Sequence, residues 1–215
     1  MPLYDFLAPA YDLAFEKIHR SFRERALEKL PVLAESCVLD LACGTGQNFP
    51  LLAARLGPQA HLIGLDISTG MLKHARKRAV DPRVSLIHDQ AANLSQAMLE
   101  AAAGVPFVDF VFCSYGLTSM RDPEAAFRAS WNVLKPGGAY GILDIYAAKP
   151  SLHARAVEWA THSDFTDRAW QPLREASPDF RMDYLDPSAH LFGGRLFVAW
   201  GTKPLATPHT SLCPS

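Results

Sequence analysis

The residues with the clearest chemical content are a carboxylate and two glycines that follow it closely. Asp40 lies within an apolar run, and Gly44 and Gly46 complete a D-x-x-x-G-x-G spacing. The glycines allow positive φ and let a ligand approach the backbone, and the free N–H groups of a following helix face that ligand. A carboxylate attracts an ammonium group and repels a pyrophosphate. The turn, including Ala42 and Cys43, is therefore expected to bind a cationic or zwitterionic ligand.

The same turn departs from a dinucleotide site. The fingerprint G-x-G-x-x-G/A needs a small third residue so that the helix packs closely on its strand. Phe49 occupies that place here. On this motif alone, an unrelated glycine-rich turn of a doubly wound fold is the alternative.

Two further carboxylates lie at the ends of predicted strands, at residues 61–66 and 84–88. Asp66 follows Gly46 by about 20 residues, where a carboxylate that binds ribose hydroxyls is expected. Ile67 beside it is placed to pack on an adenine face. Ser68 is predicted to cap the next helix, in which Met71 faces inward as a further expected contact. Asp89 follows the second of these strands.

Composition limits the classes of protein and partner. The chain has 215 residues, which suits one domain with a sizeable core, and its net charge of −1 gives no sign of a polyanion-binding protein. The four cysteines have neither metal-site nor disulfide-framework spacing. We see no signal peptide, and no apolar run approaches the ~20 residues of a membrane span. These features predict a soluble, cytoplasmic protein without a metal.

The spacing of these motifs resembles a known family. Residues 40–46 resemble motif I of the class I S-adenosylmethionine-dependent methyltransferases, and residues 134–138 (Leu-Lys-Pro-Gly-Gly) resemble a further signature. The opening Tyr-Asp-x-x-Ala-x-x-Tyr-Asp resembles the quinone-biosynthesis methyltransferases and some bacterial phospholipid N-methyltransferases. The resemblance implies an α/β fold with a doubly wound, Rossmann-like, seven-stranded sheet, a C-terminal antiparallel hairpin and an N-terminal helical lid. It also implies S-adenosyl-L-methionine as cofactor and S-adenosyl-L-homocysteine as product.

The resemblance also assigns expected contacts beyond the glycine turn. It implies adenine contacts from residues 89–91 (Asp89, Gln90 and Ala91) and a contact from Tyr11 as the N-terminal segment closes over the cofactor. Ser114 and Tyr115 follow the predicted strand at residues 107–114, at the edge where doubly wound sheets bind ligands. The family's Asn/Asp/Ser-Pro-Pro-aromatic motif for nucleic-acid bases is missing after this strand, so no nucleic acid is expected as acceptor.

Catalysis needs few side chains, because an activated methyl group can be transferred largely through positioning. Where a base is needed, Asp144 and Tyr146, at the end of the predicted strand at residues 139–145, are the best-placed side chains. Strand-end capping and packing in the cavity wall are equally compatible roles for them. His19 and Arg23 belong to the polar face predicted for a helix at residues 13–33.

The predicted organisation is a single methyltransferase domain over residues 1–203. It comprises a helical lid (1–33), a cofactor-binding core (37–146) and a variable substrate region with a closing hairpin (147–203), followed by a loose tail (204–215). In the variable region we expect helices at 151–160 and 168–176 and strands at 180–184 and 195–200. Four aromatic residues there are expected in the core or the substrate wall: Trp159, Phe165, Trp170 and Tyr184.

The sequence therefore predicts a methyltransferase that acts on a small-molecule or lipid-like acceptor. One alternative is a phospholipid amine N-methyltransferase, with peripheral membrane contact through the basic N-terminal helix. The other is a catalytically silent S-adenosylmethionine-binding partner subunit. The sequence names neither the acceptor atom nor the oligomeric state.

Overall fold

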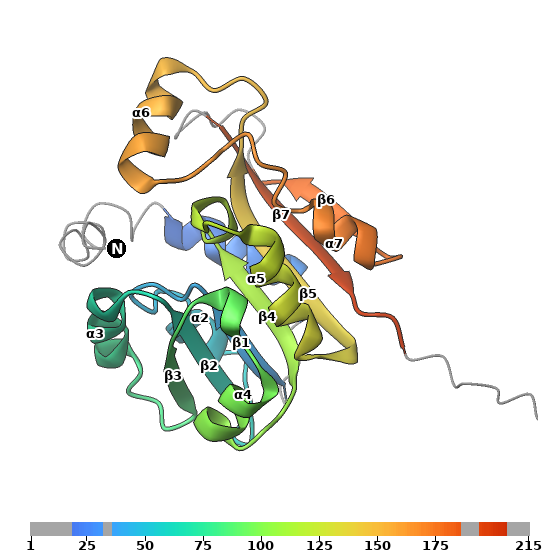
Figure 1. Ribbon diagram of the computed structural model, residues 1–215. Helices are drawn as coiled ribbons and strands as arrows, with labels where there is room; N and C mark the ends of the chain where they lie inside the picture. Colours follow the sequence, from blue (N-terminus) through green and yellow to red (C-terminus); the bar gives the residue numbers. More distant parts are fainter. Residues whose placement is uncertain (1–18, 32–35, 186–193, 206–215) are drawn as a thin grey trace, which may run out of the picture.

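A computed structural model describes residues 19–31, 36–185 and 194–205 (Figure 1). The predictions for Tyr11 and for the rest of the lid segment before residue 19 lie outside the described residues. So does the predicted tail from residue 206 onward.

One seven-stranded sheet organises the described residues, with strand order β3-β2-β1-β4-β5-β7-β6. The strands are β1 (Cys37–Leu41), β2 (His61–Asp66), β3 (Val84–His88), β4 (Val108–Ser114), β5 (Leu134–Tyr146), β6 (Arg181–Tyr184) and β7 (Arg195–Thr202). The first five strands pair in parallel, and β7 pairs antiparallel with both β5 and β6. The predicted doubly wound sheet and its closing antiparallel hairpin are confirmed.

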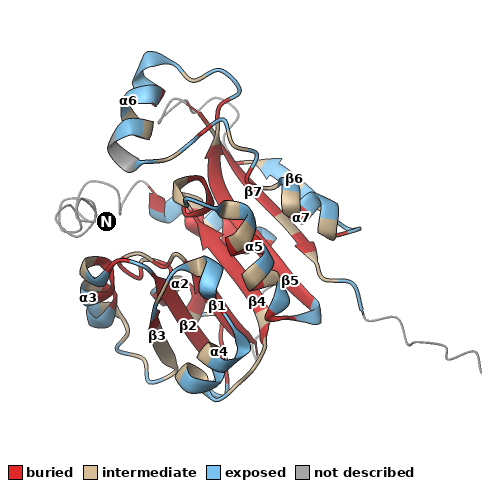
Figure 2. Cartoon of the chain, in the orientation of Figure 1, coloured by how far each residue is buried: buried red, intermediate tan, exposed pale blue. Residues whose placement is uncertain are grey.

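Helices cover both faces of this sheet (Figure 1). They are α2 (Phe49–Ala53), α3 (Thr69–Arg78), α4 (Gln96–Ala103), α5 (Pro123–Asn132), α6 (Leu152–Thr161) and α7 (Gln171–Ala176), with a further helix at residues 19–29. Leu99 of α4, Phe127 of α5 and Leu173 of α7 belong to one core cluster. Leu27 and Leu72, from the helix at 19–29 and from α3, belong to a second cluster. The strands between them are buried (Figure 2).

The predicted cap at Ser68 is confirmed, and two other helices also have clear boundary residues. Ser68 precedes α3 and its side chain accepts from the backbone N–H of Met71. Asp122 caps α5 in the same way, and Pro123 lies in the first turn, where its missing N–H costs nothing. Gly104 ends α4 in the left-handed conformation, with φ +71°.

Strand β5 is longer than predicted. It begins at Leu134, because Leu134 pairs with Val108 before the register shifts along β4. Gly137, with φ +79°, donates its N–H to the carbonyl of Lys203 at 2.8 Å, and Lys203 donates back to Gly138 at 2.8 Å. The Pro-Gly-Gly stretch, which was predicted to precede this strand, thus belongs to it and continues its pairing with the segment after β7.

The variable region differs from prediction in two places. Helix α7 begins at Gln171, three residues later than expected. Trp159 is 81% exposed on α6, so its placement in the core or substrate wall was wrong. Phe165 is buried, and Trp170 packs edge-on against Phe197 with ring centroids 4.9 Å apart. Leu152, also on α6, is 88% exposed.

Candidate active site

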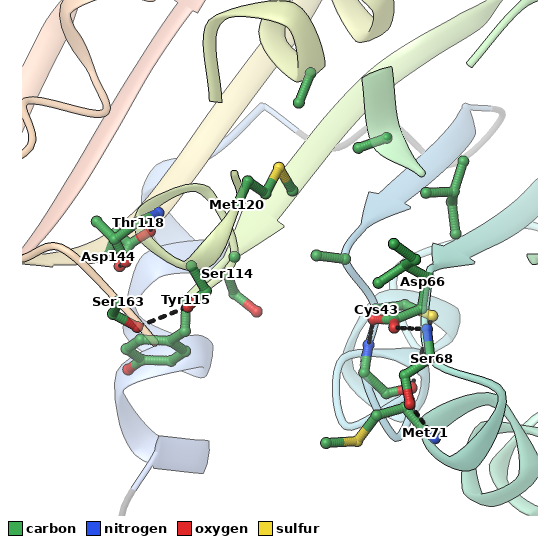
Figure 3. A pocket seen from close by; sticks show the side chains of 18 of the residues that line it. Cys43, Asp66, Ser68, Met71, Ser114, Tyr115, Thr118, Met120, Asp144 and Ser163 are labelled. Carbon is green, nitrogen blue, oxygen red and sulfur yellow. Dashed lines mark hydrogen bonds between the residues drawn. The ribbon is translucent and has the colours of Figure 1, made fainter. Parts of the chain in front are cut away.

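A cavity of about 450 Å³ opens at the carboxyl ends of β1, β2, β4 and β5. This is where strand order reverses between β1 and β4, the usual ligand position in doubly wound sheets. Figure 3 shows Cys43 and Asp66 on one side of the cavity and Thr118, Asp144 and Ser163 on the other. We call the first side the turn end (residues 42–48 and 66–71). The second is the apolar end, defined by Met120, Ala126, Ile145, Val157 and Phe165.

The glycine turn is held in an unusual backbone conformation. Ala42, Gly44 and Gly46 all have positive φ, at 57°, 55° and 79°, and Ala42 adopts it despite its side chain, which is sterically costly. Ala42, Cys43 and Gly44 line the cavity. Gly46 instead faces Phe49, because a Cβ at Gly46 would lie 2.6 Å from the Phe49 ring. The third fingerprint position is therefore filled by an aromatic ring that packs beneath the turn.

Asp66 joins the glycine turn to the start of α3. Its carboxylate accepts from the backbone N–H of Gly44 and of Ser68, both at 2.8 Å. Burial raises the pKa of this carboxyl, and the two backbone hydrogen bonds oppose that change. A carboxylate offers about four acceptor positions, so Asp66 keeps capacity for ligand hydroxyls where it lines the cavity.

Asp40 lies behind the cavity wall instead of in it. Its side chain is fully buried and accepts from Asn48 Nδ2 at 2.8 Å, and the same Nδ2 donates to Ser114 Oγ at 2.9 Å. Asn48 and Ser114 both line the cavity. Burial raises the pKa of Asp40 to about 7, against the hydrogen bond from Asn48 and the positive charge of Arg23. The structure thus brings Asp40 to the site through Asn48, which sequence reasoning had not singled out.

The predicted adenine contacts divide into two groups. Gln90, Ala91 and Ile67 line the cavity together with Met71, and Ile67 is 45% exposed. The carboxylate of Asp89 lies off the wall, where it accepts from the backbone N–H of Gln90 and from Asn93 Nδ2, both at 2.7 Å. It therefore shapes the short turn at Ala91–Asn93.

His19 and Arg23 bring the helix at residues 19–29 into the cavity wall. Both are only 5% exposed, so this part of the helix's polar face turns toward the cavity and not toward solvent. The His19 ring meets Tyr115 edge-on with centroids 4.5 Å apart, and the Arg23 guanidinium lies 5.2 Å from the Tyr115 ring. Tyr115 itself has φ 57°. Burial and the charge of Arg23 lower the pKa of His19 to about 3, so this imidazole is neutral.

Only one of the two predicted catalytic side chains, Asp144, lines the cavity. It accepts from Thr118 Oγ1 at 2.9 Å, Thr118 N at 3.3 Å and Ile145 N at 2.9 Å. Burial raises its pKa to about 6, against these three hydrogen bonds. Tyr146 packs edge-on against Trp170, with ring centroids 4.7 Å apart, at the edge of the core cluster that contains Phe197. The structure places Tyr146 away from the cavity.

The apolar end is held in place by loop hydrogen bonds. Ser119 Oγ and Ser163 Oγ lie 2.7 Å apart. The N–H of Asp164 donates to the carbonyl of Thr118 at 2.8 Å, and that of Ala147 donates to Phe165 at 2.8 Å. These bonds fix the segment after α6 across the loop that follows β4.

Two absences were established for the described residues. None of the described His, Cys, Asp and Glu side chains form a group of three or more able to hold a metal ion. Within residues 19–31, 36–185 and 194–205, no helix is both long and apolar enough to cross a membrane.

Comparisons with known proteins agree with this geometry. A family profile described as "Methyltransferase domain" matches residues 38–138. The demethylmenaquinone methyltransferase of Lactiplantibacillus plantarum is 32% identical over 73% of this chain and 67% of its own length. That of Listeria monocytogenes is 30% identical over 66% of this chain, and the match spans only 60% of the relative's length. An O-methyltransferase family protein from Burkholderia thailandensis superposes with a TM-score of 0.68 at 20% identity, covering 93% of this chain and 60% of that one.

The chain belongs to the class I S-adenosylmethionine-dependent methyltransferase family. S-adenosylmethionine is the cofactor of this family, and the residues present fit it. The carboxylate of Asp66 can accept from ribose hydroxyls, and Ile67 and Ala91 offer apolar surface beside it for a base.

Proposed function

We propose that this protein transfers a methyl group from S-adenosylmethionine to a lipid-like aromatic acceptor of quinone type. One observation carries the proposal: a single cavity joins the turn end, with Asp66 and Gly44, to the apolar end, with Met120, Val157 and Phe165. Demethylmenaquinone is the substrate named for two relatives of this chain. An apolar ring with a hydrocarbon tail suits the apolar end, because apolar walls favour removal of such surface from water.

When bound, the cofactor supplies an activated methyl group on a sulfonium. The chain's own residues bind it, orient the acceptor and exclude water. Asp66 and the Gly44 turn fix one reactant, while the loop bonds around Ser119 and Ser163 fix the walls that hold the other. Positioning of two reactants in a shared cavity accounts for much of the rate gain in such transfers.

Asp144 is the side chain proposed to take a proton from the acceptor. It is the buried carboxylate that lines the cavity beside the apolar end. Its pKa of about 6 leaves it mainly ionised at neutral pH yet more basic than an exposed aspartate, as general-base catalysis favours. Three hydrogen bonds fix its orientation.

Helix α6 is the surface that we propose meets a membrane carrying such an acceptor. Leu152 and Trp159 are exposed on one face of α6. Val157, on a different face of the same helix, lines the cavity. Arg155 and His153 flank the exposed apolar residues, the pattern of an interfacial helix. The helix at residues 19–29 suits that role less, since Lys29 pairs with Asp183 at 2.8 Å and Arg25 donates to the carbonyl of Leu185.

A labelled-methyl assay tests the proposed function. Purified protein receives S-adenosylmethionine with a labelled methyl group and a panel of demethylated quinols, phenols, amines and phosphatidylethanolamine vesicles. The expected result is label in the quinol arm. Label in the vesicle lipid alone would favour a phospholipid amine methyltransferase. Binding of the cofactor with no label in any arm would favour a silent partner subunit.

A further inference from the structure

The two carboxylate oxygens of Asp144 have unequal surroundings. Oδ1 accepts from the Thr118 hydroxyl and from the backbone N–H of Ile145, both at 2.9 Å. Among the described residues, Oδ2 accepts only from the backbone N–H of Thr118, at a longer 3.3 Å. Each oxygen of an ionised carboxylate offers about two acceptor positions. Oδ1 is therefore saturated, whereas Oδ2 keeps one position for a further donor.

The backbone of Thr118 is fixed independently of its hydroxyl. Its carbonyl accepts from the N–H of Asp164 at 2.8 Å, and Oγ of the neighbouring Ser119 lies 2.7 Å from Ser163 Oγ. Both bonds tie the loop after β4 to the segment after α6. Thr118 is 4% exposed and lines the cavity together with Asp144, and Figure 3 shows the two side chains next to one another. The hydroxyl thus reaches Asp144 from a backbone that other bonds hold in place.

This hydroxyl determines how the carboxylate of Asp144 is turned. The χ2 torsion of an aspartate is broad and roughly two-fold, so hydrogen bonds must decide which oxygen is available to a ligand. The branched side chain of Thr118 is stiff at χ1, and its hydroxyl has one hydrogen to donate. Because Oδ1 receives that hydrogen, the bond favours one of the two orientations.

We propose that Thr118 is a positioning residue that leaves Oδ2 of Asp144 as the oxygen that takes the acceptor's proton. The inference rests on the proposed function, in which Asp144 is the base. The O–H bond of the acceptor breaks as its proton moves to Oδ2, and the electron pair stays on the acceptor. The acceptor then forms its bond to the methyl group, while the pair of the broken methyl–sulfur bond remains on sulfur. The Thr118 hydroxyl neither gains nor loses a proton.

Thr118→Val tests this role, because it removes the hydroxyl and keeps the branched shape. The measurement is a pH–rate profile with the best acceptor of the labelled-methyl panel. The plateau at high pH, where Asp144 is fully ionised, should fall roughly 10-fold, less than the ~10²- to 10⁴-fold loss expected without a base. The inflection should move above the parent value of about 6, because the Thr118 hydrogen bonds lower the pKa of Asp144. The KM for the acceptor should change little, and Thr118→Ser should restore plateau and inflection.

Stability gives a second measurement that needs no acceptor. The folded pKa of Asp144 lies above its unfolded value, so its contribution to the free energy of unfolding is lost as pH rises through the folded pKa. Loss of the Thr118 hydroxyl raises the folded pKa further, so in Thr118→Val this decline should extend to higher pH. Asp167, whose charge raises the pKa of Asp144, and the Cys113 thiol, which interacts with Asp144, are unchanged in the variant. The difference from the parent therefore reports the Thr118 hydroxyl.

Thr166→Val is the matched control. The Thr166 hydroxyl also donates to a carboxylate, Asp164 Oδ1 at 2.6 Å, but at an exposed position, so the pH–rate profile should not change. A folded Thr118→Val with the parent's plateau and inflection would overturn the inference and leave the proposed function standing. Failure of Thr118→Ser to restore them would do the same. If the parent methylates no acceptor, the proposed function and this inference fall together.

Discussion

The two ends of the cavity are held in different ways. At the turn end, side chains and backbone of the sheet's own loops bind one another, as Asp66 does with Gly44 and Ser68. At the apolar end, Met120, Val157 and Phe165 come from three separate segments, joined mainly by loop hydrogen bonds. The turn end suits a ligand that does not vary, such as the cofactor. The residues of the apolar end can vary with the acceptor while the sheet stays the same. Variants at each end should therefore separate cofactor binding from acceptor recognition.

The largest expected effect is on the rate of transfer, in Asp144→Asn. Loss of a general base lowers the rate by about 10²- to 10⁴-fold, while S-adenosylhomocysteine should bind as before. With its pKa at about 6, the parent rate should rise with pH up to that value and then level off. A pH–rate profile of both proteins is the measurement. A variant that keeps the parent's rate and profile would remove Asp144 from catalysis.

The same residue has a signature in stability. The folded pKa of about 6 lies above the unfolded value of roughly 3.9, so between these values the folded state binds more protons than the unfolded state. The contribution of Asp144 to the free energy of unfolding is therefore greatest below about pH 4 and falls as pH rises to about 6. Chemical denaturation at several pH values should show that the free energy of unfolding declines less steeply with rising pH in Asp144→Asn than in the parent protein. Identical slopes would contradict the raised pKa.

A smaller effect, confined to the turn end, is expected for Asp66→Ala. The change removes ribose hydrogen bonds worth about 1.5–3 kcal/mol each and also frees the N–H groups of Gly44 and Ser68. The dissociation constant of the cofactor should rise roughly 100-fold and the melting temperature should fall, while the KM for the acceptor changes little. Calorimetry and thermal unfolding measure the first two. An unchanged dissociation constant would show that Asp66 only braces the turn.

A smaller change still is expected at the apolar end from Phe165→Leu. Reducing this buried ring should cost about 1 kcal/mol of stability and raise the acceptor KM several-fold, because the wall no longer fits the acceptor. Binding of S-adenosylhomocysteine should stay the same. Steady-state kinetics with the best acceptor of the panel, alongside calorimetry, would show it. Equal losses of cofactor and acceptor binding would mean that the two ends are not separable.

The smallest effect on the fold is expected on α6, in the double variant Leu152→Ser/Trp159→Ser. Both side chains are more than 80% exposed, so the free energy of unfolding should change by no more than about 0.5 kcal/mol. Sedimentation with vesicles that contain anionic lipid should nevertheless decrease, and turnover of a water-soluble acceptor should not. Vesicle binding equal to that of the parent would exclude α6 as the membrane contact.

More of the turn end than of the apolar end could be predicted from the sequence, for physical reasons. Glycines, strand-end carboxylates and caps act through local geometry, so the positions of Gly44, Asp66 and Ser68 could be predicted. Arg23 could not, because helical spacing only divides a polar from an apolar face. It does not say that Tyr115, far along the chain, will cover the polar one.

Neighbouring positions on strand β5 posed a different difficulty. Asp144 and Tyr146 are two residues apart, and an ideal strand would place both on one face. The strand ends at Tyr146, where the tyrosine ring packs against Trp170 of the variable region and does not line the cavity. The same region left Trp159 exposed against expectation, since its packing depends on contacts between distant segments.

The ring of Phe49 has a consequence for how this chain can change over time. A Cβ at Gly46 would come within 2.6 Å of that ring, and so would a Cβ at Gly64 in the middle of β2. A smaller residue at position 49 would relieve the closest clash at Gly64, whereas Gly46 stays constrained by its φ of 79° whatever the space beside it. Positions 49 and 64 should therefore vary together across descendants of this sequence, while position 46 stays glycine. Saturation libraries should recover substitutions at Gly64 only together with a reduced side chain at position 49.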